Sequence, residues 1–196
     1  PFSVQKVTDL RNTPVLAASM IAYDQKLYIG TIYGCRAVEM NEGQFLTAKL
    51  PGLESVDHLV NAMLHFDGGL LIGSPMDGIQ LFKNGSSTTI SKYGATALLR
   101  SKREPNRLFV GTQGGLFSML MKDGRWQDEG RVEGVNHPVH HLHELPNGDL
   151  WASRAEVSQI RFAGDFLANA IVTTFDSTHG FDTDHLDFDM LEHEDK

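Results

Sequence analysis

A short motif occurs four times along the chain, and its spacing is the strongest constraint on the fold. Each copy contains two or three aliphatic or aromatic residues, a small residue and then a hydroxyl residue. The four hydroxyl residues are Thr31, Ser74, Thr112 and Ser153. They are separated by 43, 38 and 41 residues, and repeats of about 40 to 50 residues are typical of four-stranded β-propeller blades.

Each repeat divides into four short strands. Turn residues that favour tight hairpins, such as Asp67-Gly68-Gly69 and Asn84-Gly85, separate apolar stretches. The predicted first strands are Val15 to Ala22, Leu59 to Phe66, Ala95 to Arg100 and Val139 to Glu144. Third and fourth strands are predicted at Ile79 to Phe82, Val157 to Phe162, Ser87 to Ser91 and Ala170 to Phe175.

The resulting prediction is an all-β chain, a β-propeller of about four four-stranded antiparallel blades within residues 1–196. The blades are expected at about 15–55, 56–94, 95–136 and 137–180, with 1–14 and 181–196 as strands of a shared or incomplete blade. A β-sandwich or a β-solenoid is the alternative, because both also contain short strands separated by turns. A sandwich does not explain why the same motif returns about every 40 residues.

The third and fourth repeats resemble a known family. The segments 147–153, Asn-Gly-Asp-Leu-Trp-Ala-Ser, and 108–116, Leu-Phe-Val-Gly-Thr-Gln-Gly-Gly-Leu, are similar to the repeat of the two-component regulator propellers. Residues 174–181 resemble the phrase that joins blades in that family. The resemblance implies a sensor region of a histidine kinase or a related signalling protein, in the periplasm or outside the cell.

Charge and composition exclude some partners. The formal net charge is −8 and no Lys/Arg-rich run occurs, which argues against nucleic acid, since binding it requires cations that neutralise phosphates. No apolar run approaches the roughly 20 residues of a membrane helix, so we predict no membrane insertion by this chain. The single cysteine, Cys35, stands where other repeats have Ile, Leu or Val, and is predicted to be a buried apolar substitute.

The two ends of the chain allow two alternatives for the closure of the ring. Residues 2–8 look like an outer strand and residues 185–191 like the first strand of another blade. They either pair with each other and close a small ring, or they are edges of a longer array, and open blade edges then invite self-association. Because residue 1 is Pro rather than Met, we expect a processed product or a piece of a longer chain.

Candidate binding residues come from the loops between second and third strands and from the connections between blades. In a propeller these loops meet on one face around the channel, which is the default binding surface. The residues that they offer are Tyr33, His58, Met76, Asp77, Gln113, His137 and Arg154. We predict no catalytic residue and no cofactor.

The segment His137 to His143 contains four histidines, a composition that suits zinc or copper. On a strand, however, His141 and His143 point to one face and His140 to the other, so further ligands would have to come from elsewhere. We therefore predict no metal site, and interpret these histidines as residues that line the channel or cap polar groups.

Two functions from different classes remain. The favoured hypothesis is a non-enzymatic sensor or interaction module that binds a small molecule or a neighbouring protein domain. The alternative is a propeller enzyme of lactonase, lyase or glycosidase type, which would need clustered carboxylates or a metal at the channel mouth. A purely structural or assembly role is a third reading. Few carboxylates occur in the candidate loops, so the sequence favours the module.

Overall fold

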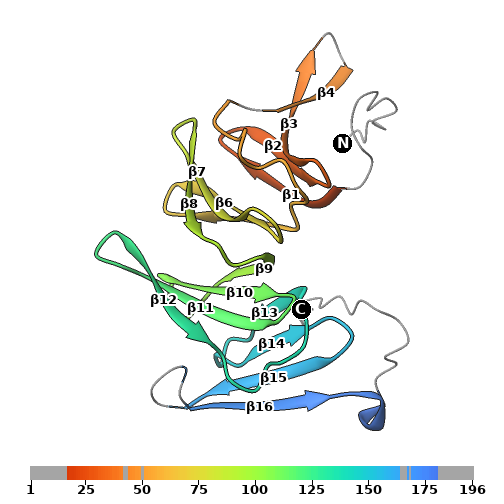
Figure 1. Cartoon of the computed structure of the whole chain (residues 1–196), viewed down its shortest axis with the longest axis vertical. Helices are drawn as coiled ribbons and strands as arrows, with labels where there is room; N and C mark the ends of the chain where they lie inside the picture. Colours follow the sequence, from red (N-terminus) through yellow and green to blue (C-terminus); the bar gives the residue numbers. More distant parts are fainter. Residues whose placement is uncertain (1–16, 42–43, 50, 164–166, 168, 181–196) are drawn as a thin grey trace, which may run out of the picture. The chain divides into compact units, whose positions relative to one another are not determined.

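The computed structural model describes residues 17–41, 44–49, 51–163, 167 and 169–180. The strands predicted at 2–8 and 185–191 lie outside these residues. The chain divides into two compact units, Pro1–Lys92 (unit 1) and Tyr93–Lys196 (unit 2). Each unit contains two sheets (Figure 1).

The described strands form four antiparallel four-stranded sheets, and in each sheet consecutive strands are neighbours. Unit 1 contains blade 1, with β1 (Ala17–Tyr23), β2 (Lys26–Thr31), β3 (Gly34–Asn41) and β4 (Gln44–Ala48), and blade 2, with β5 (Ala62–Phe66), β6 (Gly69–Ser74), β7 (Gly78–Lys83) and β8 (Ser86–Ser91). Unit 2 contains blade 3, with β9 (Ala95–Arg100), β10 (Arg107–Thr112), β11 (Gly115–Lys122) and β12 (Arg125–Arg131), and blade 4, with β13 (His141–Glu144), β14 (Leu150–Ser153), β15 (Val157–Phe162) and β16 (Ala170–Phe175). The predicted all-β propeller fold with about four blades is confirmed.

Three predicted strands, at 95–100, 157–162 and 170–175, match the observed ones residue for residue. The first strands of blades 2 and 4 begin later than predicted, at Ala62 and His141. The reason is that the residues before them are bonded to the preceding blade. The N–H of Val60 donates to the carbonyl oxygen of Thr31 and that of Val139 to the oxygen of Thr112, both at 3.0 Å.

Several hairpins turn where the sequence predicts them. Asp67-Gly68 and Asn84-Gly85 both have positive φ at the two residues, with angles of 48° and 67° in the first and 52° and 75° in the second. Two consecutive positive φ values are typical of the tight turn that matches the twist of paired strands. These turns therefore determine the register of β5 with β6 and of β7 with β8.

The recurring hydroxyl residue closes the turn between second and third strands. Thr112 Oγ1 accepts a hydrogen bond from the N–H of Gly114 at 3.1 Å and donates to the carbonyl oxygen of Gly115 at 3.0 Å. Thr31 makes the corresponding bonds with Tyr33 and Gly34. The buried hydroxyl therefore satisfies main-chain polar groups of the turn, which explains why the motif always ends on Ser or Thr.

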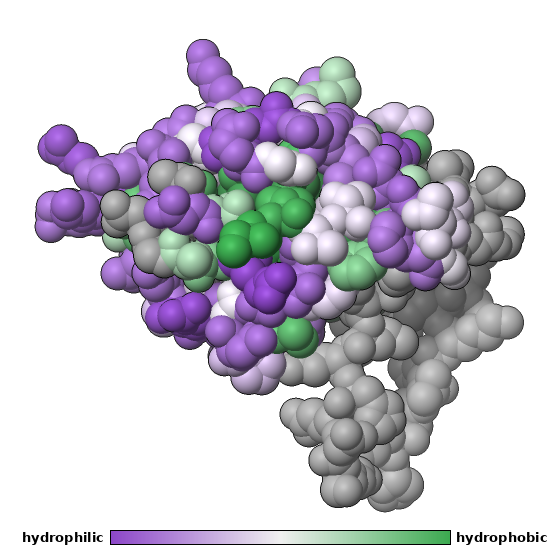
Figure 2. All heavy atoms as spheres, turned by 90° about the horizontal axis from the view of Figure 1, so that it is seen from below, coloured by the Kyte–Doolittle hydropathy of each residue, from purple (hydrophilic) through white to green (hydrophobic). Residues whose placement is uncertain are grey.

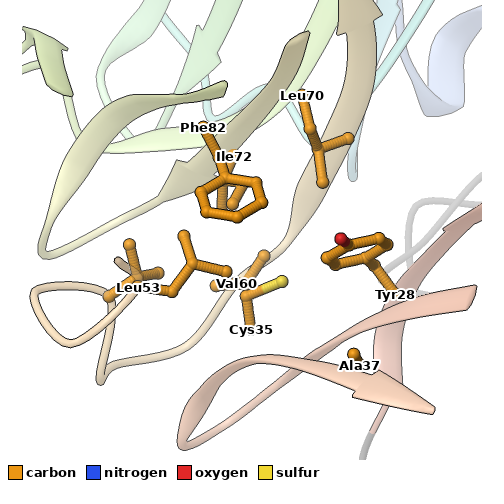
Figure 3. Packing of buried hydrophobic residues seen from close by; sticks show 9 residues of the cluster. Tyr28, Cys35, Ala37, Leu53, Val60, Leu70, Ile72 and Phe82 are labelled. Carbon is orange, nitrogen blue, oxygen red and sulfur yellow. The ribbon is translucent and has the colours of Figure 1, made fainter. Parts of the chain in front are cut away.

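The core of unit 1 lies between blades 1 and 2. Figure 3 shows side chains of both sheets meeting there, together with two from the connection between the blades. The labelled residues are Tyr28, Cys35 and Ala37 from blade 1, Leu70, Ile72 and Phe82 from blade 2, and Leu53 and Val60 from the connection. Cys35 is fully buried, as predicted, and burial raises the pKa of its thiol to about 12.

Unit 2 has a second core of the same kind, with Phe109, Leu150 and Ile160 fully buried. The rings of Phe109 and Phe162 stack with centroids 5.7 Å apart. Figure 2 shows one face of the molecule, which is mostly hydrophilic with a small group of hydrophobic residues. No helix within the described residues is long and apolar enough to cross a membrane.

Candidate functional site

Four of the predicted binding residues lie at one end of unit 1. Tyr33 occupies the turn between β2 and β3, Met76 and Asp77 the turn between β6 and β7, and His58 the connection between the blades. These segments adjoin one another. A Cβ atom on Gly34 would lie 2.1 Å from the carbonyl oxygen of Val56 and 3.1 Å from the Cα of Asp57, so only glycine allows the turn to approach the connection this closely. We call this region the loop end of unit 1.

His58 and Asp77 are joined twice at this loop end. The Nδ1 atom of His58 lies 2.7 Å from Asp77 Oδ1, and the main-chain N–H of His58 donates to Asp77 Oδ2 at 3.1 Å. The hydrogen bond with Asp77, together with the charge of that carboxylate, raises the pKa of the His58 imidazole above its usual value. The ring is therefore held in one orientation by a charged partner.

The carboxylate of Asp77 is itself held in place. Only 11% of its side chain is exposed, and Ser74 Oγ donates to its Oδ2 at 3.4 Å. The hydroxyl of Ser74 also accepts from the N–H groups of Met76 and Asp77. Thus the same hydroxyl position that closes the turn here also holds the carboxylate of Asp77 in place.

A third group, Asp57, was not among the predicted site residues. Its Oδ1 lies 3.0 Å from His58 Nδ1, and the three side chains offer ligand atoms that all lie within 4.8 Å of one another. The sequence contains a signal for this position. Residues 54–60, Glu-Ser-Val-Asp-His-Leu-Val, recur as residues 133–139, Glu-Gly-Val-Asn-His-Pro-Val, so the connection between blades is a repeated motif of its own.

Exposed apolar side chains lie in the two turns of the loop end of unit 1. Ile32, Tyr33 and Met76 are 38%, 56% and 71% exposed, and they lie in the two turns described above. Large hydrophobic side chains at the tips of well-anchored turns are typical of contact surfaces, since folding gains nothing from their exposure. The loop end of unit 1 therefore combines apolar contact area with a preoriented histidine and carboxylate.

The corresponding histidine of unit 2 has a different environment. His137 is buried, with its Nε2 atom 2.8 Å from Ser158 Oγ and its Nδ1 atom 2.9 Å from the carbonyl oxygen of Pro138. At the position of Ser158, unit 1 has the apolar Ile79, which offers a ring nitrogen no partner. This difference explains why the ring turns inward in one unit and outward in the other.

The other predicted residues of unit 2 form a separate polar group. Gln113 lies in the turn between β10 and β11 and bridges two neighbours. Its Nε2 atom is 3.2 Å from His140 Nε2, and its Oε1 atom accepts from Arg154 Nη1 at 3.3 Å. Within the described residues, the histidines of 137–143 belong to no group of three metal-ligating side chains.

A hollow of about 320 Å³ lies at the opposite end of unit 1. This volume is at the lower limit for small-molecule sites. Its walls include the aromatic rings of Tyr23, Tyr28 and Phe82, and burial raises the pKa of the Tyr28 hydroxyl. The hollow is a second candidate surface, lined by the β1–β2 hairpin of blade 1 and the β7–β8 hairpin of blade 2 rather than by the loops predicted from the sequence.

The comparisons with known proteins support the fold and no specific family. No protein-family model matches the chain, and no curated protein matches its sequence. Similar solved structures include the extracellular domain of a one-component system from B. thetaiotaomicron (TM-score 0.54, 18% identity) and virginiamycin B lyase from Staphylococcus aureus (TM-score 0.52, 9% identity). A third is the computationally designed Ika4 protein (TM-score 0.52, 15% identity).

The matched lengths differ widely among these structures. The first match covers 74% of this chain and 21% of the one-component system's chain, and the second covers 80% of this chain and 54% of the lyase. The designed protein is matched over 98% of its length and 88% of this chain. At these identities the likeness concerns the fold alone.

Proposed function

We propose that this chain is a non-enzymatic binding module, which recognises a small molecule or a neighbouring protein domain through the loop end of unit 1. The observation that carries the proposal is the arrangement of Tyr33 and Met76, both exposed, beside the His58–Asp77 pair. Ligand sites combine apolar area with a few oriented polar groups, and this loop end has both.

The turns that carry these groups are anchored by main-chain and hydroxyl bonds. Thr31 bonds to both Tyr33 and Gly34, and Ser74 to both Met76 and Asp77. A surface held in one shape before binding loses little conformational entropy when it binds. This preorganisation supports a recognition role.

A place in signal transduction, in the periplasm or outside the cell, is the second part of the proposal. It is supported by the resemblance of residues 108–116 and 147–153 to the regulator propeller repeat. The likeness in fold to an extracellular domain of a one-component system is compatible with it. In this role the module would transmit ligand binding to an output domain through its packing.

The enzyme alternative has one observation in its favour. A histidine that is hydrogen-bonded to a carboxylate, as His58 is to Asp77, is the arrangement of a general base. Within the described residues, however, no serine, threonine or cysteine side chain is hydrogen-bonded to the ring of His58. A single experiment can distinguish binding from turnover.

The experiment uses protein labelled with ¹³C in the methionine methyl groups. The chain is mixed in turn with monosaccharides, amino acids, nucleotides and small carboxylic acids, and NMR spectra follow both the methyl signals and the added compound. The proposal predicts that one class shifts the Met76 signal without being converted. Conversion of the bound compound would support the enzyme alternative.

Met20 provides the matched control. It is 67% exposed, similar to Met76, but lies on β1 rather than in one of the two turns of the loop end. A compound that shifts the methyl signal of Met20 as much as that of Met76 binds nonspecifically. A second sample carries ¹³C in the tyrosine rings. A compound that shifts the ring signals of Tyr28 there and leaves the Met76 signal unchanged would place the site in the hollow and contradict the loop-end proposal.

A further inference from the structure

Two carboxylates meet one imidazole nitrogen at the loop end of unit 1. The Nδ1 atom of His58 lies 2.7 Å from Asp77 Oδ1 and 3.0 Å from Asp57 Oδ1. That nitrogen carries at most one hydrogen, so only one carboxylate can receive a full hydrogen bond from it. The shorter distance assigns that bond to Asp77, so among the described residues Asp57 Oδ1 faces the same nitrogen without a donor of its own.

Among the described residues, His58 is the only side chain that can place a positive charge beside these two carboxylates. No lysine or arginine in that part of the chain forms an ion pair with Asp57 or Asp77. Asp77 is also largely buried, and a positive charge beside a buried carboxylate stabilises it in addition to its hydrogen bonds. A cation between the three side chains would satisfy both carboxylates at once.

Unit 2 shows that the fold does not require this arrangement. The equivalent positions there are Asn136 and His137, and the Asn136 side chain accepts a hydrogen bond from Arg131 while the His137 ring is buried against Ser158. The connection nevertheless packs in the same way, with Val139 bonded to Thr112 as Val60 is to Thr31. The convergence of Asp57, His58 and Asp77 is therefore a property of unit 1 that its packing does not explain.

We propose that Asp57, His58 and Asp77 bind one divalent transition-metal ion, with zinc as the ion of best fit. One imidazole nitrogen and two carboxylate oxygens suit zinc and its neighbours in the first transition series. With three protein ligands, a tetrahedral ion keeps one position for water or for a group of a bound ligand. The ion would thus present an electrophilic centre beside the apolar side chains of Tyr33 and Met76.

The geometry needs only a small adjustment. Ligand atoms in a tetrahedral zinc site are separated by roughly 3.4 Å, since each lies about 2.1 Å from the metal. The two N–O distances here are shorter than that by roughly 0.7 and 0.4 Å, and the ligand atoms of the three side chains all lie within 4.8 Å of one another. The side chains of His58 and Asp57 are 47% and 58% exposed, so both can rotate outward to admit an ion. Asp77 remains the fixed ligand, held by Ser74 and by the N–H of His58.

The test is zinc binding by isothermal titration calorimetry, using the full chain after treatment with EDTA. We expect one tight zinc ion per chain in the wild type and affinity at least about tenfold lower in His58→Gln and in Asp77→Asn. His179→Gln is the matched control, because His179 is an equally exposed histidine 3.1 Å from a single carboxylate, that of Asp176. It should bind zinc as the wild type does.

Cobalt identifies the location independently of affinity. Paramagnetic Co²⁺ should broaden or shift the methyl signal of Met76, next to Asp77, more strongly than that of Met20 on β1. Equal zinc affinity in the wild type, His58→Gln and Asp77→Asn would overturn the proposal, as would the absence of a zinc-binding event in the wild type. Circular dichroism confirms that each variant is folded.

This inference rests on the proposed function only in using the same loop end. The two can fail separately. Loss of zinc binding with a retained shift of Met76 by an organic compound would overturn the metal site alone. If the chain binds zinc but none of the organic compounds binds to it, the metal site is supported and the proposal of a small-molecule binding module is contradicted.

Discussion

Gly111 lies directly against the main chain of Val139. A Cβ atom on residue 111 would stand 2.6 Å from the carbonyl oxygen of Val139 and 2.8 Å from its Cγ1 atom. Gly30 and Val60 stand in the same relationship in unit 1, with the same two distances. The small residue of the repeated motif is therefore the point at which the connection from one blade crosses the second strand of the blade before it.

Gly111→Ala should destabilise unit 2 by about 1 to 3 kcal/mol, because the added methyl group forces the connection away from β10. Both tryptophans of the chain, Trp126 and Trp151, lie in unit 2, so urea denaturation followed by their fluorescence reports on this unit. Gly114→Ala is the control, since its nearest neighbour would be 3.8 Å away, and its midpoint should be close to that of the wild type. Equal midpoints for Gly111→Ala and the wild type would contradict the close approach.

Thr112→Val should destabilise the same unit by about 1 to 3 kcal/mol, because it removes a buried hydroxyl and leaves two main-chain groups of the turn without their partner. The hydroxyl bonds to Gly114 and Gly115 in the folded chain. Thr112→Ser keeps these bonds and should retain most of the stability. If the valine and serine variants unfold at the same urea concentration, the recurrence of the hydroxyl has another cause.

The sequence predicts most strands because each blade repeats the same pattern of apolar stretches and turn residues. The prediction places the starts of β5 and β13 too early. The apolar residues before these strands continue the strand pattern in the sequence, but their main chain is hydrogen-bonded to the preceding blade. Val60 and Val139 read as strand residues, yet each donates to a carbonyl group about 27 to 29 residues earlier. Only the three-dimensional contact separates a connection from a strand.

The candidate site was predictable in part for a similar reason. His58 and Asp77 lie 19 residues apart in separate loops, and the repeat correctly assigns both to the same end. The repeat pattern alone does not indicate which way the imidazole ring of His58 points. His58 and His137 occupy equivalent positions, but the partner that turns His137 inward is Ser158, and unit 1 has Ile79 in its place.

Arg107→Leu should destabilise unit 2 by about 2 to 4 kcal/mol, because it leaves the carboxylate of Glu129 without its cation. The buried guanidinium of Arg107 pairs with Glu129 and with Glu104, and donates to Ser118 Oγ at 3.0 Å. The double variant Arg107→Leu, Glu129→Leu should recover part of the loss, since the largely buried Glu129 carboxylate is then no longer left unpaired, whereas that of Glu104 is 47% exposed and can be hydrated. Tryptophan fluorescence in urea measures both.

Arg125→Leu is the control for that pair of variants, because Arg125 lies on β12 with its side chain exposed. Its removal should change the urea midpoint little. A double variant that is less stable than Arg107→Leu alone would mean that Glu129 contributes through contacts other than its ion pair.

The thiol of Cys35 should remain unreactive in the folded chain and report on the core of unit 1. It is fully buried and lies 3.8 Å from the sulfur of Met63. Burial raises its pKa from 9.0 to about 12, so the thiolate that attacks a disulfide reagent is scarce at neutral pH. Because the folded-state pKa is the higher one, the stabilisation from keeping this thiol neutral is complete below pH 9 and is lost as the pH rises toward 12.

Ellman's reagent at pH 8 should therefore release no colour from the native chain and one equivalent from the chain in guanidinium chloride, and Cys35→Ala should release none in either. Rapid reaction in native buffer would mean that blades 1 and 2 separate readily, and would place the weakest part of the fold beside the loop end that we propose as the binding surface.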